Sequence, residues 1–177
     1  MRLPRLLIAS LIAVPAFAHS QALALALAPA AGDPRAPLFV STEWLGRHLH
    51  DADLVLLHVG DPRDFPAAHI AGARLISTQD VSVSDRSAGG LVLEMPSRDT
   101  LRARLAALGI SDGSRIILYY GKDWVSPTTR ILLTLEWAGL GDRTSMLDGG
   151  MGAWTAEGNA TTAEIPAPVT GTLSPLK

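Results

Sequence analysis

One stretch of the chain, residues 115–130 (RIILYYGKDWVSPTTR), restricts the possible folds more than any other. Residues 116–120 form a continuous apolar run of β-branched, leucine and aromatic side chains, which is typical of a strand that is buried on both faces. A short loop follows this run. Ser126 then offers an N-cap side chain and Pro127 suits the first helical position, so we expect a helix from there to about Ala138.

This strand–loop–helix unit places a short loop at the carboxyl end of a buried strand. In open α/β sheets that position is where ligands usually bind. The free amide N–H groups at the start of the helix favour an anion or a thiolate there. The chain has no cysteine among its 177 residues, however, which excludes disulfides, thiolate metal sites and a cysteine nucleophile from this chain.

The rest of the chain alternates short apolar runs with segments that favour helices. We expect further strands at residues 38–40, 54–59, 74–76 and 144–147. We expect helices at residues 42–49, 98–108 and 151–156, and a short helix that starts at Pro62 with Asp61 as its N-cap. This alternation predicts an α/β domain in which a five-stranded parallel sheet is covered by helices on both faces.

Individual residues mark where the longer helices should start and end. Ser41 and Ser97 are expected to be the N-caps of the helices at residues 42–49 and 98–108. Gly109 is expected to follow the second of these helices in the left-handed conformation that glycine adopts easily.

The first eighteen residues have the pattern of a secretory signal peptide. Arg2 and Arg5 supply the positive region, residues 6–14 are apolar, and residues 16–18 (AFA) fit the small-residue cleavage site. We therefore expect secretion across the inner membrane to the periplasm, with no stable membrane anchor after cleavage, because the apolar run is too short to span a bilayer. Residues 19–37 are expected to form a flexible leader.

The net charge of −2 and the lack of a basic stripe argue against a nucleic-acid partner. After the expected domain, residues 38–158, the composition changes. Residues 159–177 include three prolines and show no helical or strand period, which predicts a linker to a further domain.

Three local matches are similar to the rhodanese-like domain, the fold of the sulfurtransferase family. One is the strand–loop–helix at residues 120–130, which lies where the active loop of that family should be. Residues 61–65 (DPRDF) with residues 69–73 (HIAGA) resemble the family's D-P-x-x-F and H-I-P-G-A, with Ala71 in place of the proline. Residues 147–158, LDGGMGAWTAEG, resemble its closing L-D-G-G…A-W…G. The resemblance covers residues 38–158 and implies a three-layer rhodanese-like fold with a five-stranded parallel sheet.

The departures from the family pattern bear on activity. The resemblance implies a catalytic cysteine at the first loop position after the fourth strand, where this chain has Gly121. The family's D-V-R at the end of the second strand is replaced by residues 58–60, His-Val-Gly. The chain thus resembles the non-catalytic N-terminal domain of a two-domain rhodanese, which would support a catalytic rhodanese domain on its C-terminal side. The alternative is a stand-alone module that binds an anion or a partner protein.

The candidate site for a small sulfur anion such as thiosulfate is the loop with the first turns of the following helix. Its residues are Gly121, Lys122, Asp123, Trp124, Val125, Ser126 and Arg130. Other interpretations stay open: Lys122 as a solvated charge, Arg130 paired with a carboxylate on a neighbouring turn, and Trp124 as a lid over the sheet or a partner contact. Ser126 lacks an evident base, so an N-cap role explains it better than a nucleophilic one.

Histidines raise the question of a metal site, but their spacing argues against one. His48 and His50 would point to different faces of a helix. His58 ends a buried strand and is expected to be a hydrogen-bonded core histidine, while His69 is expected to make a structural hydrogen bond in its turn. We therefore expect no metal and no cofactor.

Overall fold

The computed structural model describes residues 38–122 and 124–176. The expected signal peptide and flexible leader, residues 1–18 and 19–37, lie outside the described residues, as does Asp123. Within the described part, no helix is both long enough and apolar enough to cross a membrane.

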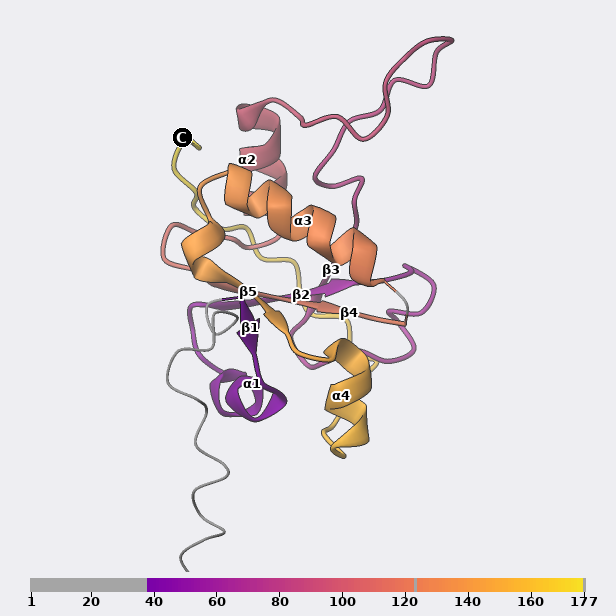
Figure 1. Ribbon diagram of the computed structural model, residues 1–177. Helices are drawn as coiled ribbons and strands as arrows, with labels where there is room; N and C mark the ends of the chain where they lie inside the picture. The colour runs from indigo at the N-terminus through magenta and orange to yellow at the C-terminus, as the bar shows by residue number, and fades with distance from the viewer. Residues whose placement is uncertain (1–37, 123, 177) are drawn as a thin grey trace, which may run out of the picture. The chain divides into compact units, whose positions relative to one another are not determined.

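Five parallel strands form the sheet, in the order β1-β5-β4-β2-β3. The strands are β1 (Phe39–Val40), β2 (Leu54–Val59), β3 (Arg74–Ile76), β4 (Arg115–Tyr120) and β5 (Thr144–Leu147). The helices are α1 (Thr42–His48), α2 (Arg98–Ala107), α3 (Val125–Trp137) and α4 (Gly150–Ala156), with a 3₁₀ turn, η2 (Gly141–Arg143), before β5. Figure 1 shows α2 and α3 on one face of the sheet and α1 and α4 on the other. This confirms the predicted fold class.

The alternating side chains of the two central strands divide the core into two clusters. Ile116 and Leu118 of β4 pack on the side that holds Leu101 of α2 and Ile131 of α3. Ile117 and Tyr119 point the other way, towards the cluster that includes Leu45 of α1 and Trp154 of α4. Because successive residues of a strand face opposite sides, a run that is apolar throughout can fill both clusters.

The predicted caps of α1 and α2 are confirmed. The Ser41 hydroxyl accepts a hydrogen bond from Trp44 N at 3.1 Å, and the Ser97 hydroxyl accepts one from Thr100 N at 3.2 Å. Gly109 has a φ of +82°, as expected for a left-handed residue after a helix.

Three other predicted helix starts are wrong. α3 begins at Val125 with Trp124 as its N-cap, so Ser126 is already helical. The Trp124 carbonyl accepts the N–H of Thr128 at 3.1 Å, and Pro127 fits the first turn because N–H groups there have no intrahelical partner. α4 begins one residue earlier than predicted, after Gly149.

The short helix predicted from Pro62 is also not formed, and residues 62–67 are turns. The Asp61 carboxylate accepts hydrogen bonds from both the backbone and the guanidinium of Arg63 instead of capping a helix. This arrangement is an Asx-type turn, a known competitor of helix formation.

A long excursion without helix or strand connects β3 to α2. Part of it, residues 83–94, forms an arm that projects away from the domain in Figure 1. A pair of backbone hydrogen bonds between Val83 and Glu94, of 2.9 and 3.0 Å, closes the base of the arm. Its far end exposes Leu91 and Val92, and Leu93 has a φ of +58°.

The C-terminal segment, residues 159–176, is packed against the domain, and we call it the strap. As the composition predicted, it contains no helix or strand. Thr162 exchanges two backbone hydrogen bonds with His69, of 2.8 and 2.9 Å, and Leu173 is buried in the core with 6% of its surface exposed. Ser174 donates two hydrogen bonds to Asp112, which lower the pKa of that carboxyl group. That the strap leads to a further domain stays a prediction.

We predict that the strap contributes to the stability of the domain. Leu173→Ala removes a buried side chain and should lower the free energy of unfolding by about 2–4 kcal/mol. The matched control is Val169→Ala, at a position in the same segment that is 49% exposed, where the change should stay within about 0.5 kcal/mol. Urea unfolding of both variants measures the difference, and equal stabilities would show that the strap is not part of the folded unit.

Candidate functional site

The candidate loop begins at the carboxyl end of β4, in the middle of the sheet. Gly121 N donates a hydrogen bond to Val59 O at 2.9 Å, which extends the β2–β4 ladder by one step beyond β4. On the other side of β4, Gly150 lies so close that a Cβ atom there would be 2.8 Å from Tyr120 O. The loop is therefore held between the turn after β2 and the start of α4.

His58 is the last residue but one of β2, which pairs with β4. Its imidazole therefore lies directly beside Gly121, the residue that follows β4. The side chain is 3% exposed. A Cβ atom built on Gly121 would be 3.3 Å from His58 Nε2, and one built on Gly60 would be 2.2 Å from the same atom. A side chain at position 60 would therefore clash with the imidazole, so the observed position of the His58 ring requires a glycine there. A side chain at position 121 would touch the ring.

Neither ring nitrogen of His58 has a hydrogen-bond partner among the described residues. The prediction of a hydrogen-bonded core histidine is thus right about burial and wrong about partners. Burial is the main cause that lowers the pKa of His58 to about 4, and His69 lowers it further, while Asp64 acts in the opposite direction. The imidazole is therefore neutral near neutral pH.

Aromatic rings surround this imidazole. Tyr119 meets it edge-on with ring centres 4.8 Å apart, and Phe65 lies at 5.2 Å. Phe65 in turn stacks on His69 at 4.1 Å. The Tyr119 hydroxyl accepts the N–H of Ile70 at 3.0 Å, and burial raises the pKa of this phenol. These groups form a largely apolar wall below the loop.

His69 makes the structural hydrogen bonds that its turn motif predicted. Its Nδ1 lies 2.8 Å from Phe65 O and its Nε2 lies 3.1 Å from Glu164 O in the strap. Since both partners are carbonyl oxygens, both contacts can be hydrogen bonds at the same time only when both ring nitrogens carry a proton. His69 thus fastens the strap to the turn that holds Phe65.

The residues of the predicted loop do not all face one site. Lys122 is exposed, in agreement with a solvated charge. Trp124 is half-buried and packs against the core cluster under α3, which favours the lid interpretation. Val125 and Ser126 are exposed in the first turn of α3, and Ser126 Oγ has no hydrogen bond to an imidazole in the described part of the chain.

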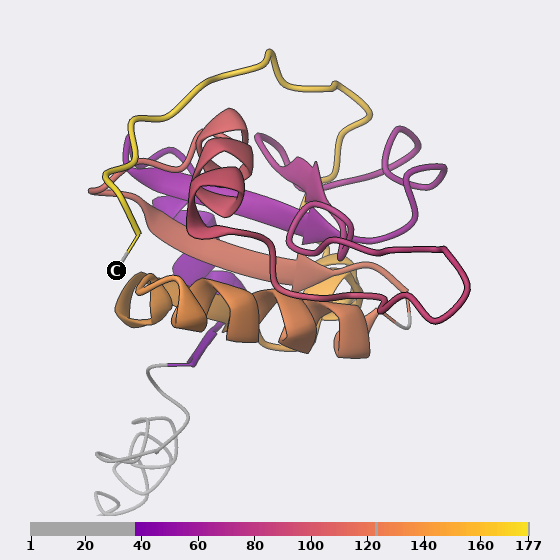
Figure 2. The same cartoon turned by 90° about the horizontal axis from the view of Figure 1, so that it is seen from above.

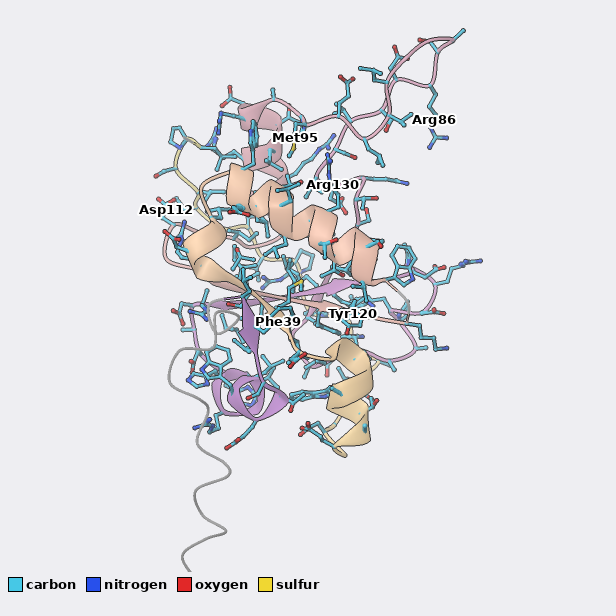
Figure 3. The ribbon with its side chains drawn as sticks, in the orientation of Figure 1. Phe39, Arg86, Met95, Asp112, Tyr120 and Arg130 are labelled. Carbon is cyan, nitrogen blue, oxygen red and sulfur yellow. The ribbon has the colours of Figure 1, made fainter. Side chains whose placement is uncertain are left out.

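Arg130 points away from the loop. Its Nη2 donates a hydrogen bond to Leu93 O at 2.7 Å and lies 4.0 Å from Met95 Sδ. Figure 3 shows Arg130 and Met95 near each other, where the arm approaches α3. No carboxylate among the described residues pairs with Arg130, so the open interpretation of an ion pair is not supported there. Arg130 instead ties the arm to the helix that follows the candidate loop.

The described residues contain no group of three histidine or acidic side chains that could hold a metal ion. What the site offers chemically is a neutral, buried imidazole, two flanking glycines and the amides of a helix start. Sequence reasoning identified His58, Gly60 and Gly121 separately. It missed the contact of the His58 ring with the two glycines. The one sequence signal was that His58 interrupts the apolar run of β2 near its end and that Gly121 directly follows the apolar run of β4.

Comparison with known proteins identifies a family. The model of the rhodanese-like domain matches residues 41–157. The chain is 28% identical over 137 residues to a thiosulfate sulfurtransferase of Azotobacter vinelandii, and 28% identical over 139 residues to one of Pseudomonas aeruginosa. These alignments cover 76% and 77% of this chain but 48% and 49% of the relatives. The chain therefore spans about half the length of these curated relatives.

Solved structures agree on the fold. SseA from Escherichia coli, a 3-mercaptopyruvate sulfotransferase, has a TM-score of 0.64 at 21% identity, covering 75% of this chain and 53% of that one. The 3-mercaptopyruvate sulfurtransferase from Leishmania major has a TM-score of 0.67 at 16% identity, covering 79% and 40%. Likeness at these identities shows the fold alone. The predicted rhodanese-like fold is confirmed.

We predict that His58 makes the protein sensitive to acid. In the unfolded chain an imidazole takes up its proton near pH 6.5, whereas folded His58 does so only near pH 4. Between these values only the unfolded state binds the proton, so the folded state loses stability as the pH falls. The loss should reach about 2–3 kcal/mol below pH 4 and should be absent above about pH 7.

Urea unfolding of the full chain at a series of pH values measures this loss. His58→Phe keeps a ring in the pocket but removes the titration, so its stability should fall less in acid than that of the unaltered chain. His50→Phe, at an exposed position, is the matched control and should retain the full loss. Identical acid profiles for all three proteins would contradict the role of His58.

Proposed function

Since this chain belongs to the rhodanese-like domain family, we propose that it is an exported member that transfers no sulfur by itself and supports a separate sulfurtransferase domain. The proposal rests on one observation, that position 121 is a glycine. It follows β4 at the start of the loop, where resemblance to the family places the cysteine, and a glycine has no atom that can accept sulfur.

Neither His58 nor Ser126, the two candidate groups near Gly121, is placed to act as a substitute nucleophile. The His58 imidazole lies against that position, but its ring nitrogens are enclosed, and no hydroxyl of the described residues is hydrogen-bonded to it. Ser126 lies exposed in the first turn of α3 and makes no hydrogen bond to an imidazole among the described residues. A serine without a base is a weak nucleophile.

The proposal of a second domain rests on length. The thiosulfate sulfurtransferases of Azotobacter vinelandii and Pseudomonas aeruginosa are about twice as long as the part that matches this chain. A catalytic rhodanese domain on the C-terminal side of the chain would supply the cysteine, and this domain would pack against it and shape the cleft. The pattern of residues 1–18 supports export, with the periplasm as the destination.

A stand-alone module that binds small sulfur anions is the competing function. Among the described residues, α3 has no acidic side chain in its first turn, and the positive end of its dipole favours an anion there. Against this, Arg130 is engaged with the arm and does not face the loop. Shifts of the amide resonances of residues 121–126 with millimolar thiosulfate would favour the competing function.

We predict that the unaltered chain forms no thiocyanate from thiosulfate and cyanide, and that Gly121→Cys gains single-turnover chemistry. The new thiol would lie at the carboxyl end of β4, ahead of the free amide groups at the start of α3, which favour its thiolate form. Attack of the thiolate on the outer sulfur of thiosulfate leaves that sulfur on the cysteine and releases sulfite. Intact-mass measurement after incubation with thiosulfate should show the gain of one sulfur atom.

Ser126→Cys is the matched control, because it places the chain's single thiol on the exposed first turn of α3, away from Gly121. It should remain unmodified under the same conditions. Activity of the unaltered chain would refute the non-catalytic assignment, and an inert Gly121→Cys variant would refute the assignment of Gly121 to the nucleophile position.

We also predict that the protein from its native source is larger than the 18.7 kDa of this chain. A second domain would add roughly 100–150 residues. Intact-mass measurement of the purified protein decides this. A mass about 2 kDa below that of the chain, as expected from removal of a signal peptide alone, would instead favour the stand-alone module.

A further inference from the structure

A pocket of about 370 Å³ lies at the β3 edge of the sheet, apart from the candidate loop. One wall comes from the turn after β2, through Pro62, Phe65 and Pro66. The opposite wall is the strap at residues 165–169, and Ala107 at the end of α2 closes one side. Figure 2 shows the strap passing outside this edge of the sheet.

The walls of the pocket are almost entirely apolar. The lining includes Phe65 and four proline rings, two from the turn and two from the strap. At the two ends of the strap wall, Ile165 and Val169 remain 55% and 49% exposed. No carboxylate side chain lines the pocket. Walls of this kind match the faces of an aromatic or branched apolar ligand, and the volume is within the range of small-molecule sites.

Arg74 of β3 is the only charged side chain in the lining. Its Nη1 donates to Leu108 O at 2.9 Å, its Nε has no partner, and no carboxylate among the described residues pairs with it. A Cβ atom on Gly109 would be 2.4 Å from Nη1, so that glycine makes room for the guanidinium. The result is a positioned cation, uncompensated within the described residues, beside an apolar pocket.

We propose that this pocket binds a small organic anion with an aromatic body and a carboxylate or sulfonate group. The aromatic body packs against Phe65 and the proline rings, and the acidic group pairs with Arg74, whose planar guanidinium suits the oxygens of such groups. The strap forms part of the wall, so the bound ligand also holds the strap against the turn that carries Phe65. This site is independent of the proposed role of Gly121.

A fluorescent probe of this chemical class tests the proposal on the full chain. Anilinonaphthalene sulfonate carries an aromatic body and a sulfonate, and the neutral N-phenylnaphthylamine shares its ring system without the charge. The sulfonate should bind saturably and more tightly than the neutral compound. Amide resonances of Ile165, Ala167 and Val169 should shift in the complex, which locates the probe at the strap.

Two alanines of α2 provide a matched pair of variants. Ala107→Phe fills the pocket from the end of α2 and should abolish saturable binding of the sulfonate. Ala103→Phe, at another exposed position of the same helix outside the pocket lining, should leave binding unchanged. Equal binding by both variants, or no saturable binding by the unaltered chain, would overturn the proposal.

Arg74→Met tests the charge. Loss of a charge-assisted hydrogen bond should weaken sulfonate binding about tenfold or more, while the neutral compound should bind as before. Arg74→Lys, which keeps the charge, should restore part of the affinity. Thermal unfolding of both variants shows whether they remain folded. If both compounds bind equally and Arg74→Met alters neither, the site is an apolar surface for a partner protein, and the anion assignment is wrong.

Discussion

The pairing of β2 with β4 is the interaction on which the rest of this structure depends. Six pairs in register run from Leu54–Arg115 to Val59–Tyr120, and the hydrogen bond from Gly121 N to Val59 O continues the ladder into the loop. Both strands contribute buried side chains to both faces of the sheet. A slip of one residue would exchange the two faces and would move the His58 ring away from Phe65 and Tyr119.

The end of this ladder also determines what the candidate site can do. Pairing in this register places His58 next to Tyr119 and against Gly121, beneath the loop. Burial of an imidazole without a hydrogen-bond partner is unfavourable, and such local conflicts in proteins often mark functional positions. Here the conflict lies beneath the candidate loop, and the adjacent position in this chain is Gly121.

Two segments without regular structure extend the domain beyond its sheet. Arg130 fastens the arm to α3, close to the candidate loop. The strap is fastened by His69 and Asp112 and buries Leu173 in the core. The strap therefore belongs to the folded unit, and with the turn after β2 and Arg74 it lines an open apolar pocket that no part of the chain forms alone.

The sequence by itself determined the features that depend on local patterns. The apolar runs at residues 54–59 and 116–120 indicated buried parallel strands, and Ser41 and Ser97 marked helix starts, because periodicity and capping act over a few residues. The missing cysteine likewise followed from composition alone. These features were enough to predict the fold class.

The tertiary structure decided the features that depend on partners distant in the chain. The start of α3 at Val125 and the turn at Asp61 went against local signals, and the unpartnered ring of His58 depends on Gly60 and Gly121 from two strands. Docking of the strap depends on Leu173 reaching a core built from α2 and the sheet. No local pattern encodes such contacts, since each arises only when separate segments are brought together in the fold.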